Sequence, residues 1–180
     1  AKQLLFTDYA ARTLVLNLDD AFGRRLAQQL QGQARIIGYG LQPPPTDWHG
    51  EWLGAQVQAN LSGLQLQLHG LAGEVQLHSS LLGWFNAANL LATLATLLAL
   101  GIPTASALSS IAQLSTVPGR MQRFGQPGQP TVVVDYAHTH NSLEQVLTAL
   151  RAHLQGGRLL CVFGCGGERD QGKRPLMGAV

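Results

Sequence analysis

The sequence predicts an α/β protein in two parts, and three observations support this prediction. Short apolar runs alternate with helical patterns in residues 13–39 and again after residue 130, which is typical of parallel sheets covered by helices. Between these stretches, three segments alternate apolar and polar side chains with period two, as antiparallel strands with one solvent-facing side do. Pro118-Gly119 and the turn-rich run 125–130 interrupt both patterns. We therefore expect two domains, 1–118 and 119–180.

The first domain should combine a parallel strand pair, an antiparallel appendage and two apolar helices. Asp19 and Asp20 are placed to cap the helix that follows the first strand. Residues 64–69 alternate leucine with glutamine or histidine, which gives that strand one apolar and one polar face. The predicted elements are strands over 13–17 and 34–39 with a helix between them ending at Leu30, strands over 54–61, 64–69 and 74–79, and helices over 85–100 and 105–114.

The second domain should begin with a βαβ unit. Residues 131–134 form an apolar run, residues 142–153 an amphipathic helical pattern and residues 158–163 a second apolar run. A strand, a helix and a strand in this order normally build a right-handed parallel pair. We expect residues 159–163 to form a buried strand that carries the glycine-rich loop after it to the carboxyl end of the sheet.

Composition argues against nucleic-acid and membrane functions. The 180 residues carry a formal net charge of +2, only 12% are charged, and no basic run occurs, so nucleic-acid binding has no support. Asparagine and threonine interrupt the apolar stretch 81–102, which favours a buried helix over a membrane span. The chain starts with Ala-Lys and ends abruptly. We therefore expect it to be a piece of a longer protein.

Cysteine and histidine spacing indicates no metal site. Cys161 and Cys165 lie four positions apart across a strand end, which favours buried, reduced thiols in a cytosolic protein over a disulfide framework or a zinc ribbon. The histidines match no metal-binding motif. Four of them are expected to be solvated, namely His49, His69, His78 and His153.

Residues 164–175 form a glycine-rich, cationic loop. Glycines after a strand let backbone N–H groups approach a ligand closely, and such crevices suit phosphates and carboxylates. Arg169, Lys173 and Arg174 add positive charge. The loop therefore predicts an anion-binding site.

Lysine is rare among the basic residues of this chain. Of twelve lysines and arginines, only Lys2 and Lys173 are lysines. An amine can become neutral and nucleophilic, which a guanidinium cannot, so both are candidates for such chemistry. Chance retention on a solvated face is the alternative.

Three polar residues follow the strand predicted over 131–134. Asp135, His138 and Thr139 would lie at its carboxyl end, where sheets of this class bind ligands. Asp135 could accept hydrogen bonds from ribose hydroxyls. The alternative is a helix-capping turn, with Thr139 or Asn141 as the cap.

A pair of amides opens the apolar helix predicted over 85–100. Asn86 and Asn89 are three positions apart on one helical face and could bind a base edge such as that of adenine, because amides both donate and accept. The alternative is that Asn86 caps the helix. Arg120, at the predicted domain boundary, could reach across a cleft to phosphate, or lie on the surface.

Five strings together resemble the Mur ligases of peptidoglycan synthesis, and within that family they are most similar to the MurE branch. The Gly-Cys-Gly-Gly sequence is highly specific to that branch, whereas Asn-x-x-Asn and Asp-Tyr-Ala-His are shared across a superfamily that includes folylpolyglutamate synthases. His140-Asn141 departs from the usual Pro-Asp at a helix start. The strings are Asn17 to Asp20, Gly83 to Asn89, Val117 to Met121, Val132 to Thr139 and Val162 to Gly178.

The resemblance implies a domain assignment and an ATP site. The chain would hold the later part of the P-loop-type central domain, with its small antiparallel sheet, and the first half of a Rossmann-like C-terminal domain. Asn86 and Asn89 would contact adenine. Arg120, Asp135 and His138 would complete the nucleotide site on the phosphate and ribose side.

The resemblance also implies roles for three cationic residues. Lys2 would be carbamylated, and the carboxylate so formed would ligate or orient Mg²⁺, which makes it both a catalytic and a metal-ligating candidate. Arg169 would hold a carboxylate of the incoming amino acid in a bidentate pair, and Lys173 would support that pocket.

The implied reaction is ATP-dependent amide ligation by a cytoplasmic, monomeric enzyme. ATP would phosphorylate the D-glutamate carboxylate of UDP-MurNAc-L-Ala-D-Glu, and the amine of meso-diaminopimelate would attack the acyl phosphate. The P-loop and the UDP-sugar site should precede Ala1, and the Asp-Asn-Pro-Arg motif that selects diaminopimelate should follow Val180. We therefore expect the isolated 180 residues to be inactive.

Two other functions fit parts of this pattern. One is a related ligase, either a lysine-adding MurE or an enzyme similar to folylpolyglutamate synthase. The other is a non-catalytic nucleotide-binding or interaction module. Flanking sequence would distinguish them, because a P-loop before Ala1 indicates a ligase and Asp-Asn-Pro-Arg after Val180 indicates diaminopimelate.

Overall fold

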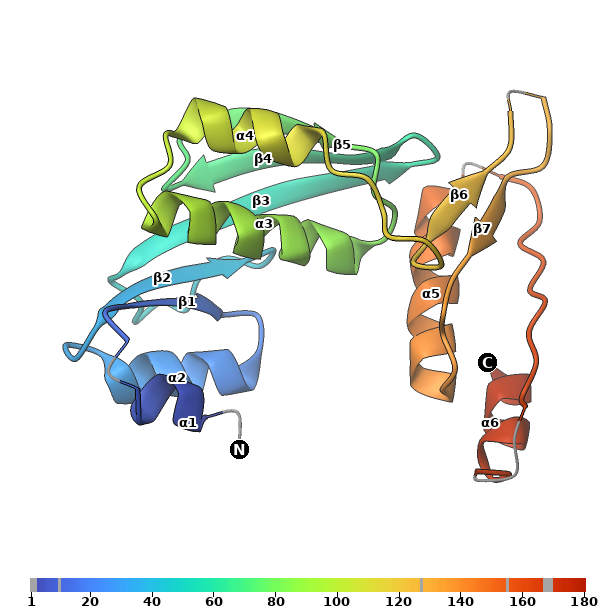
Figure 1. The fold of residues 1–180 in the computed structure, drawn as a ribbon, viewed down its shortest axis with the longest axis horizontal. Helices are drawn as coiled ribbons and strands as arrows, with labels where there is room; N and C mark the ends of the chain where they lie inside the picture. The colour runs from blue at the N-terminus through green and yellow to red at the C-terminus, as the bar shows by residue number, and fades with distance from the viewer. Residues whose placement is uncertain (1–2, 10, 127, 155, 167–169) are drawn as a thin grey trace.

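A computed structural model describes residues 3–9, 11–126, 128–154, 156–166 and 170–180 (Figure 1). A larger part, built around one sheet, precedes a smaller part at the C-terminal end of the chain. The elements are α1 (Leu4–Thr7), β1 (Thr13–Asn17), α2 (Ala21–Leu30), β2 (Arg35–Gly40), β3 (Glu51–Asn60), β4 (Gly63–Gly70), β5 (Val75–Ser79), α3 (Trp84–Ala99), α4 (Thr104–Ala112), β6 (Gln122–Phe124), β7 (Val132–Val134), α5 (His140–His153) and α6 (Lys173–Ala179).

The larger part contains a five-stranded mixed sheet with the order β1-β2-β3-β4-β5. β1, β2 and β3 pair in parallel, whereas β3, β4 and β5 pair antiparallel. In β4 the leucines at 64, 66 and 68 are buried, and the glutamines between them are more exposed. The predicted fold class, with parallel strands and an antiparallel appendage, is confirmed.

Helices cover the sheet on two sides, as Figure 1 shows for α2 and α3. On one side α3 and α4 pack on apolar side chains of β2 to β5, and this core includes Leu53, Leu66 and Leu91, each almost fully buried. On the other side α2 packs on β1 through a cluster that includes Leu16 and Leu26. Alternate residues of the parallel strands therefore serve two cores, which explains why their sequences are continuously apolar.

The β1–α2 connection is fixed by the two aspartates that the sequence singled out. Asp20 caps α2 as predicted, since its carboxylate accepts a hydrogen bond from the Phe22 N–H. Asp19 instead accepts from the N–H groups of Leu41 and Gln42, at 2.7 and 3.1 Å, and so ties the end of β2 to this turn. Burial, helped by the negative charges of Asp19 and Asp20, raises the pKa of Tyr39 above its ordinary value of 10.0.

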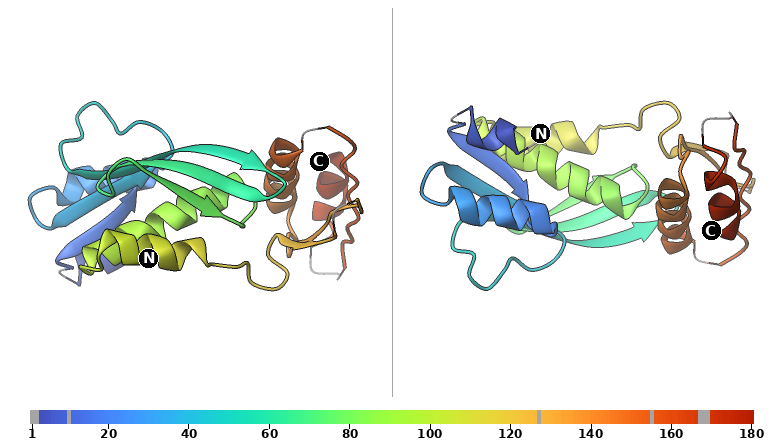
Figure 2. Two further views of the ribbon diagram at one scale, coloured as in Figure 1. Left: turned by 90° about the horizontal axis from the view of Figure 1, so that it is seen from above. Right: turned by 90° about the horizontal axis from the view of Figure 1, so that it is seen from below.

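The smaller part packs against the end of the larger sheet, as the views in Figure 2 show for α5. β6 and β7 form an antiparallel pair, and α5 follows β7. Leu82 from the larger part joins Met121 and Ala149 of the smaller part in a small buried cluster. This cluster gives the two parts a common apolar contact.

The prediction of a second strand in the βαβ unit is wrong. Residues 158–163 form no strand, and Leu160 and Val162 are 77% and 98% exposed. A parallel strand is normally buried on both faces of a wider sheet, but the described residues of this part offer it only the short β6–β7 pair. The prediction that both cysteines are buried is wrong for the same reason, since Cys161 is exposed and Cys165 is half-buried; both are free thiols, as predicted.

Among the described residues, no helix is long and apolar enough to cross a membrane. The apolar stretch 81–102 contains α3, which packs on the sheet as predicted.

Candidate functional site

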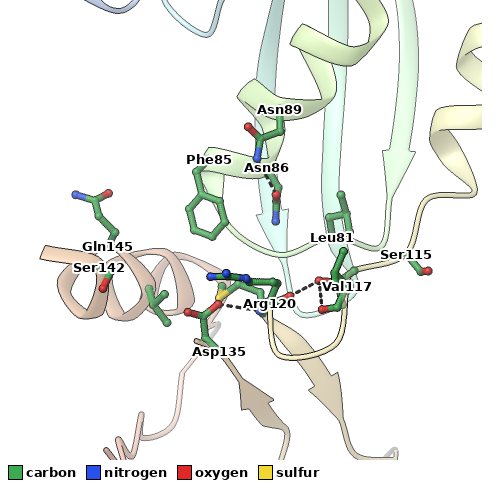
Figure 3. Close-up of a pocket in the computed structure, with 13 residues that line it drawn as sticks. Leu81, Phe85, Asn86, Asn89, Ser115, Val117, Arg120, Asp135, Ser142 and Gln145 are labelled. Carbon is green, nitrogen blue, oxygen red and sulfur yellow. Dashed lines mark hydrogen bonds between the residues drawn. The ribbon is translucent and has the colours of Figure 1, made fainter. Parts of the chain in front are cut away.

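A cavity of about 590 Å³ lies where the two parts meet (Figure 3). Pockets of this size hold small ligands such as nucleotides. The structure brings four residues predicted to bind a cofactor into its lining: Asn86, Asn89, Arg120 and Asp135. Leu81, Phe85, Ser115, Thr116, Val117, Met121, Ser142, Gln145 and Val146 complete it.

The asparagine pair lies in the first turns of α3. The Asn86 amide donates to the Leu82 carbonyl at 2.8 Å and accepts from the Asn89 amide at 3.1 Å, a bond drawn in Figure 3. The helix begins after Gly83, without a side-chain cap, so the alternative that Asn86 caps it is wrong. The described bonds use one N–H of each amide, and each amide keeps further donor or acceptor positions for a ligand.

Gly83 sets the direction in which the chain enters α3. Its φ is +91°, a conformation that side chains disfavour, and a Cβ there would come within 2.8 Å of the Phe85 ring. Phe85 forms an apolar wall of the cavity and is 39% exposed. Glycine at 83 therefore leaves room for the Phe85 ring at the wall of the cavity.

Arg120 is the one cationic residue among the described residues that line the cavity. Its guanidinium lies 4.9 Å from the centre of the Tyr136 ring, a cation–π contact. In Figure 3 the side chain extends between Phe85 and Asp135. The position suits a contact with an anionic group of a ligand bound by the asparagines.

Asp135 braces the turn that presents Arg120. One carboxylate oxygen accepts from the Met121 N–H at 2.9 Å, and the other accepts from the Ala137 N–H at 2.8 Å. Met121 has a φ of +49°, which is unusual for a residue with a side chain and costs about 1–3 kcal/mol. The Asp135 bond helps to hold this conformation next to the cavity.

His138 lies outside the described lining of the cavity and is exposed. Its ring nitrogen Nδ1 lies 3.1 Å from the Tyr136 carbonyl, and its own carbonyl accepts from Lys173 Nζ at 3.3 Å. Thr139 caps α5 in a reciprocal arrangement with Ser142. The capping alternative therefore holds for Thr139, while Asp135 lies at the cavity.

Of the three cationic residues to which the resemblance assigns roles, the structure describes Lys173. Lys173 begins α6 and contacts the segment after β7 through its bond to His138. Lys2 and Arg169 lie outside the described residues. In the part of the chain that the structure describes, no group of three or more histidine, cysteine, aspartate or glutamate side chains is placed to hold a metal ion.

Sequence patterns missed several residues of the cavity. Ser142, Gln145 and Val146 are spaced three and one apart on one face of α5 and could have been singled out. That choice needed the position of α5 across the cavity from α3, which local sequence does not specify. Phe85 carries no such signal, because an aromatic residue in an apolar helix is usually a core residue.

His153 is buried rather than solvated. Its side chain is fully buried, with Nε2 2.8 Å from the Gly83 nitrogen and Nδ1 2.5 Å from the Asn60 carbonyl oxygen. The prediction failed because the partners of this imidazole are backbone groups of the other part of the molecule, and these have no sequence signature.

The chain matches two protein families along most of its length. Residues 1–97 match the Mur ligase middle domain, and residues 119–180 match the glutamate ligase domain of Mur ligases. Two curated relatives are named UDP-N-acetylmuramoyl-L-alanyl-D-glutamate–2,6-diaminopimelate ligase. The protein from Coxiella burnetii is 44% identical over 180 residues, and that from Ectopseudomonas mendocina is 48% identical. Each match covers all of this chain, which spans 37% and 36% of the two relatives.

Solved structures agree with these matches. A structure of a UDP-N-acetylmuramoyl-L-alanyl-D-glutamate–2,6-diaminopimelate ligase superposes on 99% of this chain with a TM-score of 0.73 and 36% identity, and the match covers 36% of that protein. MurF from Acinetobacter baumannii superposes on 84% of this chain and matches 32% of its own, with a TM-score of 0.69. At 18% identity, that likeness shows the fold alone.

Proposed function

This chain belongs to the Mur ligase family, and on that premise we propose that the whole protein is an ATP-dependent amide ligase of peptidoglycan precursor synthesis. It would add meso-diaminopimelate to UDP-MurNAc-L-Ala-D-Glu. The names of the curated relatives support this reaction, although the chain spans only about a third of their length. An enzyme that consumes ATP and a UDP-linked precursor would work in the cytoplasm, and we expect a monomer.

The observation that carries the proposal is the shared cavity. Asn86 and Asn89 come from α3 in the larger part, and Arg120 and Asp135 come from residues at and after the predicted boundary near 118. A site divided in this way is complete only when the two parts are in contact. We propose that residues 1–118 and 119–180 act as separate domains whose approach assembles the nucleotide site.

The chemistry of the lining fits adenine at the α3 end. An asparagine amide can donate to and accept from neighbouring atoms of adenine at once. Asn86 and Asn89 are fixed to each other and to the helix start, so their orientation is set before a ligand binds. Phe85 supplies an apolar surface for the flat ring.

Residues of the smaller part would bind the polar end of the nucleotide. Arg120 would contact phosphate, and its stacking on Tyr136 limits the positions that the guanidinium can take. Asp135 already accepts two backbone bonds, so its main role would be to hold the turn of Arg120, with ribose as a further partner. The role of His138 in nucleotide binding stays a prediction.

Two cationic groups would serve the amino-acid substrate. We propose that Arg169 holds a carboxylate of the incoming amino acid and that Lys173 supports it from α6. ATP supplies the phosphoryl group that activates the D-glutamate carboxylate, and Mg²⁺, with Lys2 as a carbamate among its ligands, would offset the negative charge. The amine of the incoming residue then forms the amide bond and phosphate leaves.

The proposal is tested with the full-length protein that contains this chain. We expect ADP release that requires both UDP-MurNAc-L-Ala-D-Glu and meso-diaminopimelate, with little release when L-lysine replaces the latter. Preference for L-lysine would move the protein to the lysine-adding branch. Nucleotide binding without ligation of either amino acid would instead support a non-catalytic module. The isolated 180 residues should form no product.

A further inference from the structure

His153 is a buried polar group that the proposed reaction does not use. It ends α5, and its side chain is fully buried between the two parts of the molecule. A buried imidazole without hydrogen bonds is costly, so its partners determine where it can lie. Both partners are backbone groups of the larger part, 70 and 93 positions away in the sequence.

The two bonds require one form of the ring. The Gly83 N–H donates to Nε2 at 2.8 Å, so Nε2 carries no hydrogen. The Asn60 carbonyl oxygen, 2.5 Å from Nδ1, can only accept, so Nδ1 carries the hydrogen. The neutral Nδ1–H form is the form that satisfies both groups. The ring therefore joins α5 to the end of β3 and to the start of α3.

The bond to Gly83 lies next to the cavity. Gly83 precedes α3, which carries Phe85, Asn86 and Asn89 into the site. Its N–H belongs to the residue before the helix, where no carbonyl within the helix can serve as its partner. His153 supplies that partner from the opposite part of the molecule.

The helix that carries His153 also forms the facing wall. Ser142, Gln145 and Val146 line the cavity from α5, and His153 holds the far end of the same helix. Because a helix is stiff over this length, the attachment at His153 determines how the other end of α5 lies relative to Asn86 and Asn89. Between Val146 and His153 along α5, Ala149 packs with Leu82 and Met121 in a buried apolar cluster.

We propose that His153 is a positioning residue, which holds α5 against the start of α3 and so sets the separation of the two walls of the nucleotide cavity. The identity of the ligand as a nucleotide rests on the proposed function. The bond to Gly83 is the decisive one, because it acts directly on the helix start that carries the asparagines. The bond to Asn60 orients the ring.

The test compares two substitutions in the full-length protein, with MgATP as the probe. In His153→Gln the amide can reach the place of Nε2 and accept from Gly83, whereas in His153→Asn the shorter amide can reach only the place of Nδ1. We expect the glutamine variant to bind MgATP within about twofold of the unaltered protein. The asparagine variant should bind about tenfold more weakly, because the helix start that carries Asn86 and Asn89 has lost its bond to α5. His78→Gln, on an exposed position of β5, is the matched control.

The melting temperature separates positioning from general stability. Each variant loses one of two hydrogen bonds, so we expect similar decreases in melting temperature and different affinities for MgATP. Equal affinities, whether unchanged or equally reduced, would overturn the proposal. Binding is measured without peptide substrates, so a protein that binds MgATP but ligates neither amino acid contradicts the proposed function while the two variants still test His153.

The ring form gives a second test that needs no substitution. In ¹⁵N NMR spectra of the full-length protein, the hydrogen of the His153 imidazole should be on Nδ1 and not on Nε2. A ring with its hydrogen on Nε2 could not accept from Gly83 and would overturn the proposal even if the variants fail to fold.

Discussion

Residues 13–112 and residues 119–180 differ in how completely their apolar side chains are covered. In the first region, helices pack on both sides of a five-stranded sheet, and leucines such as Leu53 and Leu91 have no exposed surface. In the second, β7 is short, Val132 and Val134 are about half exposed, and Val162 is almost fully exposed. The cavity lies between a well-packed wall and a loosely packed one. We therefore expect stability to depend on the first region and nucleotide binding to depend on both.

The largest effect on stability should come from the core under α3. Leu91→Ala removes a fully buried side chain and should lower the free energy of unfolding by about 3 kcal/mol, because a cavity remains. Val162→Ala, at a position that is 98% exposed, should change it by less than about 0.5 kcal/mol. Urea denaturation of both variants checks the contrast. Similar losses would show that residues 158–163 are packed in solution.

Two glycines give a second comparison between the closely packed first region and the second region. A Cβ at Gly23 would come within 1.8 Å of the Asn17 carbonyl oxygen, so Gly23→Ala should force α2 away from β1 and cost about 2 kcal/mol. At Gly164 no atom lies within 4 Å of such a Cβ, so Gly164→Ala should be close to neutral. Thermal unfolding measures both. A neutral Gly23→Ala would contradict the described contact between α2 and β1.

The turn that carries Arg120 belongs to the loosely packed side of the cavity, and Asp135 holds it in place. Asp135→Ala removes both backbone bonds of the carboxylate and leaves Met121 without its brace, which should cost about 1–2 kcal/mol. In the full-length protein the same change should raise the KM for MgATP several-fold, since Arg120 loses its position. Asp135→Asn keeps an acceptor oxygen and should be milder in both assays. If Asp135→Ala lowers stability but leaves the KM unchanged, the turn has no part in nucleotide binding.

The smallest effect is a pH dependence in the first region. Tyr39 has a pKa above 10.0 in the folded protein, so above pH 10 the unfolded chain loses the tyrosine proton more readily than the folded one. Stability from this group should therefore be present below pH 10 and decrease as the pH rises further. Tyr39→Phe should flatten the decrease in melting temperature between pH 9 and 11. Tyr9→Phe, at an exposed position, should not.

The contrast between the regions also explains what could be predicted from sequence. In the first region, alternation in β4 and the continuous apolar runs of β1 and β2 record burial directly, so element types and bounds were close to those observed. In the second, residues 158–163 have the composition of a strand, but a strand also needs a neighbouring edge, which composition does not reveal. The β6 strand was missed because glycines and prolines follow it closely.

The candidate site divides in the same way. Polar side chains at those places call for an explanation, so four residues of the site could be identified from the sequence. They are Asn86, Asn89, Arg120 and Asp135, and the structure gathers them around one cavity. The contribution of His153 could not be foreseen, because it depends on backbone groups that are distant in sequence. Phe85, Ser142 and Gln145 became recognisable only once α5 was placed across the cavity from α3.

The central claim is that the cavity between the two regions binds the adenine end of ATP. The most direct test is the dissociation constant of MgATP for the full-length protein with Asn89→Leu, a change that removes the amide and keeps a helix-forming side chain of similar size. We predict binding at least about tenfold weaker with a melting temperature that is nearly unchanged, because Asn89 is described with one side-chain bond on the exposed side of α3. An unchanged dissociation constant would contradict the claim.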